Sequence, residues 1–119
     1  MRQQWREYHR SERGVLTKLL NYAHDRARAE GVTFDLDREW LKPKLDAGVC
    51  EVTGLPYQSV APGKHRTHPY APSLDRIVAG GPYTKDNVRL VLFAVNRAMS
   101  DWGEEVLLTI ARALVAKGG

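Results

Sequence analysis

Apolar residues recur at helical spacing near both ends of the chain. From residue 16 to residue 27, leucines and alanines fall on one side of a helix that Ser11 is placed to cap and Gly31 is placed to end. Near the other end, Asp101 and Glu104 form a capping-box-like pair in front of the apolar stripe in VLLTIARALVAK. The pattern therefore predicts two amphipathic helices, and we expect the second to cover the core.

The segment between these helices begins with a third helical pattern. Asp35 or Asp37 would cap it, and Pro43 would make it stop, kink or restart, because proline lacks a backbone donor and disfavours helical geometry at the residue before it. CEVTGLPY then predicts a tight turn or hairpin. The stretch QSVAPGKHRTHPYAP, which has three prolines, predicts an ordered loop exposed to solvent.

From residue 73 to residue 99 the pattern changes from strand to helix. SLDRIVA is β-prone, a Gly-Gly-Pro sequence forces a turn, and NVRLVLFAVNRAM passes from β-prone residues into apolar residues at helical spacing. A chain of 119 residues has room for one domain, so we expect residues 1–119 to form one. The predicted fold class is α+β, with a small two-stranded hairpin and helix flanked by N- and C-terminal helices.

Composition narrows the classes of function. Lys plus Arg number 18 and Asp plus Glu 14, and this net charge of +4 suits a polyanion but equally suits a well-solvated surface. Cys50 is the only cysteine, which excludes an intrachain disulfide and a zinc site of two or more thiolates. The sequence has no run of about 18 apolar residues and no apolar secretory stretch at its start, so we expect no membrane partner and a cytoplasmic location.

Four polar residues occupy the strand, loop, strand, helix unit. Asp75 and Arg76 lie on the first strand, Asn87 follows the turn, and Asn96 lies nine residues later on the helix. Each has an ordinary structural interpretation: Asp75 could pair with Arg76 or Arg89, Asn87 could be a turn residue, and Asn96 could cap or bridge backbone groups. Their common order and spacing is the informative feature.

This set resembles the HNH nuclease superfamily. The ββα-metal motif of that superfamily has an Asp-His pair on the first strand, an Asn after the loop, and a His or Asn nine residues further along the helix; Asp75, Asn87 and Asn96 match three of these positions. PSLDRIVAGGPYTKDNVRLV also resembles a phage-associated branch with an S-L-D-R-I strand and a G-Y-T-x-D-N turn, although Pro82 stands where that pattern has Gly. The resemblance covers about residues 49–100, and the ββα motif itself about 72–100.

The resemblance implies a phage-derived, metal-dependent endonuclease that hydrolyses DNA in the cytoplasm of a bacterial host. Asp75 and the side-chain oxygen of Asn96 would coordinate one divalent cation, and oxygen ligands suit Mg²⁺ or Mn²⁺ better than zinc. Asn87 would orient the loop or the general base. The residues expected to contact DNA or its phosphates are His65, Arg76, Lys85, Arg89 and Arg97.

The family often also carries a zinc knuckle, whose four cysteine positions here read Cys50, Thr53, Leu92 and Val95. We therefore expect no structural zinc. We expect Leu92 and Val95 to hold this part of the motif by burying apolar surface, at about 1.5–3 kcal/mol per fully buried side chain. Cys50 would then be an ordinary small buried residue.

Arg76 departs from the family because it stands where the catalytic His would be, and an arginine stays protonated and cannot act as the base. Three possibilities remain: His68 or His65 reaches in from the preceding loop, water loses its proton without a dedicated side chain, or the domain no longer cuts. We favour His68, since an ordinary histidine pKa of about 6.5 suits a base; Tyr70 and Tyr83 are lesser candidates. The main alternative function is a catalytically degenerate DNA-binding module on the same scaffold, and the third is a protein-binding adaptor.

Overall fold

The fold combines four helices with one small sheet. The computed structural model describes the backbone of residues 2–58 and 68–118, and the side chains of residues 14–58 and 68–118. The elements, in chain order, are α1 (Arg2–Glu30), α2 (Arg38–Ala47), β1 (Pro72–Arg76), β2 (Val88–Leu92), α3 (Phe93–Met99) and α4 (Glu104–Ala116).

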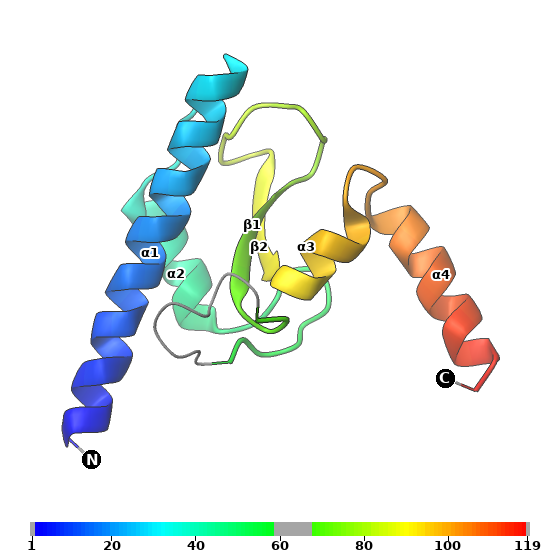
Figure 1. Cartoon of the computed structure of the whole chain (residues 1–119), viewed down its shortest axis with the longest axis horizontal. Helices are drawn as coiled ribbons and strands as arrows, with labels where there is room; N and C mark the ends of the chain where they lie inside the picture. Colours follow the sequence, from blue (N-terminus) through cyan, green and yellow to red (C-terminus); the bar gives the residue numbers. More distant parts are fainter. Residues whose placement is uncertain (1, 59–67, 119) are drawn as a thin grey trace.

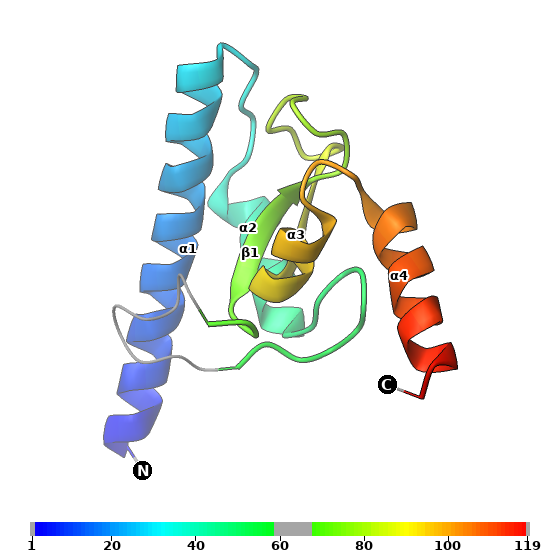
Figure 2. The same cartoon turned by 45° about the vertical axis from the view of Figure 1, so that its right-hand side comes forward.

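The antiparallel pair β1 and β2 lies at the centre of the molecule (Figure 1). Helices α1 and α2 lie along one side of this hairpin and α3 along the other, while α4 extends away beyond α3 (Figures 1 and 2). This architecture is the predicted α+β class, with a two-stranded hairpin and a helix between flanking helices.

Helix α1 is longer than the sequence pattern predicts. It begins at Arg2, so the prediction that Ser11 caps it is wrong. The residues before Ser11 are mostly Gln, Glu and Arg, which favour helix, and this preference extends the helix beyond the apolar stripe. The C-terminal end is as predicted, because Gly31 has a φ of 68°, in the left-handed region that favours glycine.

Helix α2 is capped at both ends and passes through its proline. The carboxylate of Asp37 accepts a hydrogen bond from the backbone N–H of Trp40 at 2.8 Å, and Gly48 ends the helix with a φ of 73°. Of the three outcomes expected at Pro43, the stop and the restart are wrong, since α2 continues to Ala47. Only one helical hydrogen bond needs the missing donor of a proline, and the two caps together with the buried Leu41 hold the helix.

The hairpin register divides its side chains between two faces. Asp75 lies opposite Arg89 and Leu74 opposite Leu90. Because side chains alternate along a strand, one set faces α3 and the other faces α1 and α2. We call the first set the α3 face and the second the α1 face. The α3 face consists of Ser73, Asp75, Arg89 and Val91, and the α1 face of Leu74, Arg76, Val88 and Leu90.

β1 ends before the β-prone sequence does. The strand stops at Arg76, whereas the pattern predicts strand to Ala79. Ile77 and Val78 are exposed, so their side chains gain no packing that would extend the strand. The chain instead turns into the loop that returns to β2 at Val88.

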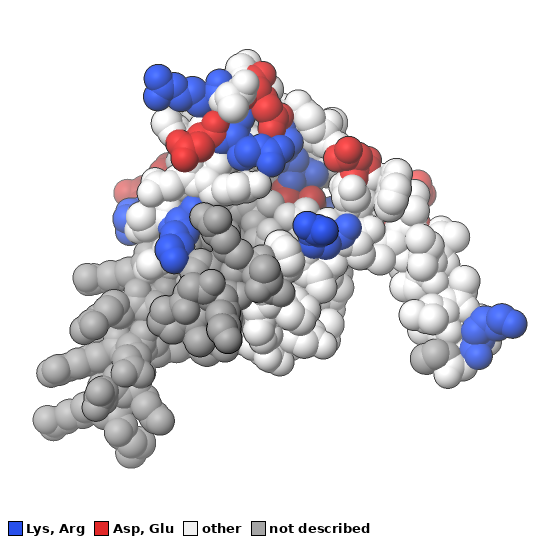
Figure 3. Space-filling model, in the orientation of Figure 1, with Lys and Arg blue, Asp and Glu red and all other residues white. Residues whose placement is uncertain are grey.

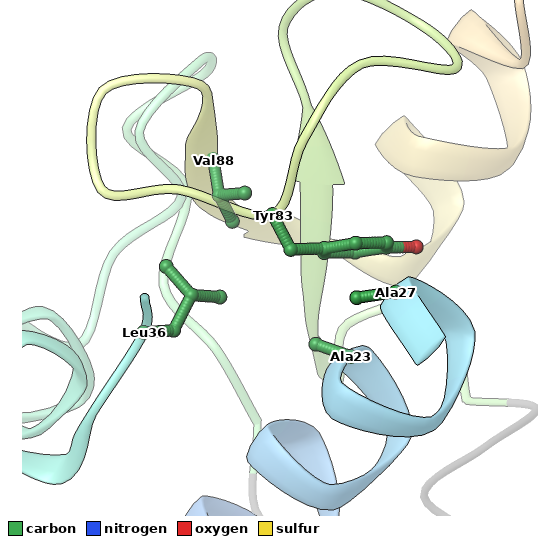
Figure 4. Close-up of a cluster of buried hydrophobic side chains, with 5 residues drawn as sticks. All are labelled: Ala23, Ala27, Leu36, Tyr83 and Val88. Atoms are coloured by element: carbon green, nitrogen blue, oxygen red, sulfur yellow. The ribbon is translucent and has the colours of Figure 1, made fainter. Parts of the chain in front are cut away.

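The α1 face closes the main apolar core. Leu90 packs with Leu16 of α1 and Leu41 of α2, all buried. At the other end of the same face, Val88 joins a cluster with Tyr83 and three further residues of α1 and the following segment (Figure 4). The ring of Tyr83 lies beside the small side chains of Ala23 and Ala27, which let it approach the helix closely (Figure 4). This packing positions the hairpin against α1.

The four zinc-knuckle positions come together on the other side of the hairpin. Cys50, Leu92 and Val95 belong to one buried apolar cluster, as predicted from the sequence. CEVTGLPY forms the predicted turn, with the backbone N–H of Cys50 donating to Leu55 O at 2.8 Å. Burial raises the pKa of the Cys50 thiol, but hydrogen bonds with Thr53 and the backbone of Leu92 outweigh burial and lower it. Apolar packing therefore holds these positions together.

The prediction that helix α4 covers the core is wrong. None of its described residues is buried, and of these Leu107 alone packs against the cluster around Cys50. Its N-cap is Gly103, which offers no side-chain acceptor, so the predicted cap at Asp101 is wrong as well. The turn before the helix leads α4 away from the body of the molecule (Figure 1).

Candidate functional site

Asp75 is a buried carboxylate on the α3 face. Its Oδ2 accepts a hydrogen bond from Arg89 Nε at 3.0 Å, and its side chain is 7% exposed. Burial raises the pKa of Asp75 above the usual aspartate value, while the Arg89 guanidinium acts in the opposite direction. One of the two pairings that the sequence left open is thus present.

Arg89 lies between two carboxylates. Besides its bond to Asp75, its Nη1 is 3.8 Å from Glu104 Oε2 at the start of α4, and its Nη2 donates to Met99 Sδ at 3.6 Å. Its side chain is 18% exposed, so the predicted DNA contact faces α3 and α4 in this arrangement. The positive charge beside the Asp75 carboxylate is therefore that of the Arg89 guanidinium.

Asn96 connects α3 to β1 on the same face. Its Nδ2 donates to Ser73 Oγ at 2.8 Å and to Leu74 O at 3.1 Å. Both amide hydrogens are therefore used, which fixes the orientation of the side chain and leaves Oδ1 as an acceptor. Ser73 and Asp75 are two residues apart on one strand, so Asn96 and Asp75 lie on the same face of the hairpin.

Asn87 ties the turn between the strands together. Its Oδ1 accepts from the backbone N–H of Val78 at 3.0 Å, and its Nδ2 donates to Pro82 O at 2.9 Å. Gly81 is required beside it, because a Cβ at that position would lie 2.8 Å from Asn87 Nδ2. Asn87 thus orients the loop, one of the two roles that the resemblance implies, and it does so as a buried turn residue.

Arg76 is held on the α1 face, away from Asp75. Its Nη1 donates to Glu30 Oε1 at 2.8 Å and to Gly81 O at 2.9 Å, and its guanidinium lies 4.5 Å from the centre of the Tyr83 ring. These three anchors lie on α1 and on the loop. Arg76, which stands where the resemblance would place a catalytic His, therefore ties the hairpin to α1.

His68 and Tyr70 lie at the end of the hairpin where α3 begins. Backbone groups from this segment cap α3, since Pro69 O accepts from Ala94 N at 3.0 Å. His68 Nδ1 accepts from the backbone N–H of Tyr70 at 3.1 Å, which in the neutral ring leaves the proton on Nε2. Nε2 is then a donor. His68 precedes β1, and Asp75 is the fourth residue of that strand; the role of His68 as general base stays a prediction.

The predicted DNA contacts are spread over several elements. Lys85 Nζ pairs with Asp37 at 3.0 Å, and its backbone N–H bonds Asp35. Arg97 lies exposed on α3 over the ring of Phe93, 5.9 Å from its centre. His65 lies outside the described residues. Around the end of the molecule where α1 meets the hairpin loop, basic and acidic side chains alternate (Figure 3), so the net positive charge does not form a uniform basic face there.

Two carboxylates of this region were missed from the sequence. Glu30 at the end of α1 holds Arg76, and Glu104 at the start of α4 approaches Arg89. Both are 15 or more positions from their partners in sequence and lie in ordinary helical patterns, so no local signal identifies them. Ser73, the third missed residue, stands in the S-L-D-R-I motif, and that position is a signal that sequence reasoning could have used.

Asp75 and Asn96 both have side-chain oxygens on the α3 face. Within the described ranges, no group of three or more His, Cys, Asp or Glu side chains is placed to hold a metal ion, so Asp75 Oδ and Asn96 Oδ1 would need water or substrate oxygens to complete a coordination shell.

In the part of the chain that the structure describes, no helix has the length and apolarity needed to cross a bilayer. No family model matches this chain, and neither does any curated protein or solved structure.

Proposed function

We propose that this protein is a divalent-cation-dependent endonuclease of the HNH type that hydrolyses DNA phosphodiester bonds. The observation that supports the proposal most is the arrangement on the α3 face. There Asn96 is fixed through Ser73 and Leu74 with its Oδ1 unused by those bonds, on the same side of the hairpin as the carboxylate of Asp75. These are the two residues to which the resemblance assigns the cation.

The donor set fits a hard cation. A carboxylate and an amide oxygen are ligands that Mg²⁺ and Mn²⁺ accept, with water and a substrate phosphate in the remaining positions. A cation bound there supplies charge stabilisation for the phosphate and the leaving oxygen, and lowers the pKa of a bound water. Asp75 would act as the anionic ligand and Asn96 as the neutral one.

Arg89 binds Asp75 through Oδ2, so a cation could take Oδ1 beside it, and could take both oxygens once Arg89 moves away. Glu104 Oε2, 3.8 Å from Arg89 Nη1, offers the guanidinium a second anionic partner. In the proposed site Arg89 moves toward Glu104 and remains close enough to contact a phosphate. The ion pair with Asp75 keeps the buried carboxylate neutralised until then.

The remaining polar groups have roles as donors. His68 Nε2 would donate to a phosphate oxygen, since its Nδ1 is used by Tyr70. Arg97, exposed on α3 one residue after Asn96, would hold the DNA backbone. Arg76 cannot act as a base, and in the neutral ring His68 Nε2 is a donor, so in this proposal the removal of a proton would fall to His65 or to water itself.

Cleavage of supercoiled plasmid in Mg²⁺ or Mn²⁺ tests the proposal. Wild type should nick or linearise the plasmid, while Asp75→Ala and Asn96→Ala should lose most of the activity. Asp101→Ala is the matched control, because Asp101 is an exposed aspartate outside the hairpin. Equal cleavage by all four proteins, each shown to be folded by circular dichroism, would refute the assigned site.

The anchoring of Arg76 favours a second function. Because Glu30, Gly81 and Tyr83 hold this arginine in a structural position, the scaffold is also consistent with a DNA-binding module without catalysis. Such a module would bind DNA with log affinity falling linearly against log salt. It would leave plasmid intact with every divalent ion, and that result would select it over the nuclease.

A further inference from the structure

Every large apolar side chain of helix α4 except Leu107 is exposed. Ile110 is 57% exposed, Leu114 62% and Val115 70%, and Trp102 in the preceding turn is 70% exposed. In Figure 3 the arm formed by α4 is almost all white, with blue at its tip. This concentration of large apolar side chains on one element differs from isolated exposed residues, which are normal on a protein surface.

A helix of this length needs a partner. Isolated helices shorter than about 12–15 residues are marginal in water, and most helical stability in proteins comes from packing an apolar face. α4 has 13 residues and, among those described, packs on the body mainly through Leu107 in its first turn. Its second half therefore presents an apolar stripe without cover from the described residues.

The charges of α4 indicate what covers it. Glu104 and Glu105 occupy the first turn, and Arg112 and Lys117 lie in the second half and at the C-cap. The polar side is thus neutral overall, whereas helices that lie on anionic lipid surfaces are rich in Lys and Arg. A second α4 in antiparallel orientation places each acidic end beside a basic end and opposes the two helix dipoles.

We infer that α4 is a dimerisation helix, which packs antiparallel against α4 of a second copy of this chain. The pairing is isologous, because the same apolar stripe is contributed by both copies, and it closes as a twofold dimer. Leu107 of one copy then lies level with Leu114 of the other. Trp102 extends over the last turn of the partner helix.

The available surface sets the strength of the dimer. A helix of 13 residues is about 20 Å long and about 10–12 Å wide, so half of its cylindrical surface is on the order of 350 Å². An exposed tryptophan adds on the order of 150 Å². Two copies then bury roughly 1,000 Å² in total, at the lower limit of about 1,000 Å² for a specific interface. The dimer should therefore dissociate on dilution.

Sedimentation velocity across a dilution series tests the dimer. Wild type should pass from dimer to monomer as it is diluted, and Ile110→Glu should be monomeric at concentrations where wild type is dimeric. Thr109→Glu adds the same charge on the polar side of the helix and should dimerise like wild type. Leu114→Ser provides a second variant if Ile110→Glu lowers the helix content measured by circular dichroism.

Cysteine cross-linking tests the orientation. In the antiparallel register the two copies of residue 111 lie about 1.5 Å apart along the helix axis, whereas the two copies of residue 117 lie about 20 Å apart. Ala111→Cys should form a disulfide-linked dimer under mild oxidation and Lys117→Cys should not. Wild type is the blank, because Cys50 is buried.

Three results would overturn the inference. If wild type is monomeric at every concentration, the dimer is excluded. The same holds if the monomer instead binds phosphatidylserine vesicles through the apolar face of α4. Dimerisation that survives both stripe variants excludes α4 as the interface. Cross-linking through residue 117 but not through residue 111 excludes the antiparallel arrangement. None of these results depends on nuclease activity.

Discussion

The two faces of the hairpin are built from the same two strands but differ in chemistry. On the α1 face, Leu74 and Leu90 pack into a core that α1 and α2 seal. On the α3 face, Asp75 and Arg89 form an ion pair in which Asp75 is buried and Arg89 stays 18% exposed. The first face buries apolar side chains, and the second face places polar side chains at the edge of the buried region. Stability and chemistry are therefore expected to respond to different substitutions.

The largest expected effect is on the α1 face. Leu90→Ala should lower the free energy of unfolding by about 2–5 kcal/mol, because Leu90 is fully buried and its truncation leaves a cavity. Urea unfolding followed by circular dichroism measures this change. Ser73→Ala, on the opposite face, is the matched control and should cost about 1 kcal/mol through its lost hydrogen bond to Asn96. Similar losses in both variants would contradict the division between the faces.

The Asp75–Arg89 pair should give the next largest effect. Arg89→Met leaves Asp75 buried without its cationic partner, which should cost about 2 kcal/mol, less than for a fully buried pair because Arg89 keeps some contact with water. Asp75→Asn combined with Arg89→Met should recover part of that loss. A double-mutant cycle by urea unfolding measures the coupling, and strictly additive effects would show that the pair is not coupled.

The same substitution should move cation binding in the opposite direction. Arg89→Met removes the internal competitor for Asp75, so Mn²⁺ should bind severalfold more tightly although the protein is less stable. Mn²⁺ electron paramagnetic resonance measures the bound fraction without requiring activity. Unchanged or weaker Mn²⁺ binding in Arg89→Met would indicate that Arg89 does not compete with the cation.

The loop that joins the faces should respond less strongly. Gly81→Ala adds a Cβ 2.8 Å from Asn87 Nδ2 and 3.0 Å from Val78 O. The resulting shift of the turn should cost roughly 1–3 kcal/mol, in the range of overpacking substitutions. Thermal unfolding measures the change. Gly80→Ala is a less suitable control, because Gly80 has a φ of 77°, in the left-handed region that favours glycine. A neutral Gly81→Ala would show that the loop adapts freely.

The smallest expected effect is the pH dependence of the Arg76 anchor. Hydrogen bonding to Arg76, and secondarily to Arg26, lowers the pKa of Glu30. A carboxyl group whose pKa is lowered in the folded state stabilises the protein at pH values above the ordinary glutamate pKa. This stabilisation is lost as the pH falls through the folded-state pKa. Wild type should therefore be more stable than Glu30→Gln near neutral pH. In melting curves recorded down to acid pH, a constant difference between the two would contradict this assignment.

The sequence was informative where local pattern controls structure. The hairpin, α3, the cap at Asp37 and the packing of Cys50 with Leu92 and Val95 all follow from residues close in the chain or from one motif. α4 was predicted as a helix, and its apolar stripe was also identified. Its failure to cover the core was not predictable, because a stripe shows that a helix needs a partner but not which surface provides it.

The candidate site was predictable only in its residue types. Asp75 and Asn96 lie on one face as their spacing in the resemblance implies, but the sequence left open whether Asp75 would pair with Arg76 or Arg89. Strand alternation separates Asp75 from Arg76 and places Arg89 opposite Asp75. Glu30 and Glu104 reach these arginines through tertiary packing, which no short sequence window contains.

The apolar filling of the knuckle positions has a practical consequence for enzymology. Where a zinc ion maintains a fold, a chelator removes structure and activity together, and the two losses cannot be separated. Here buried apolar side chains, including those of Cys50 and Met99, pack around Leu92 and Val95. EDTA should accordingly leave the melting temperature unchanged. Any loss of hydrolysis in EDTA would then be due to removal of the divalent cation of the proposed site and not to unfolding.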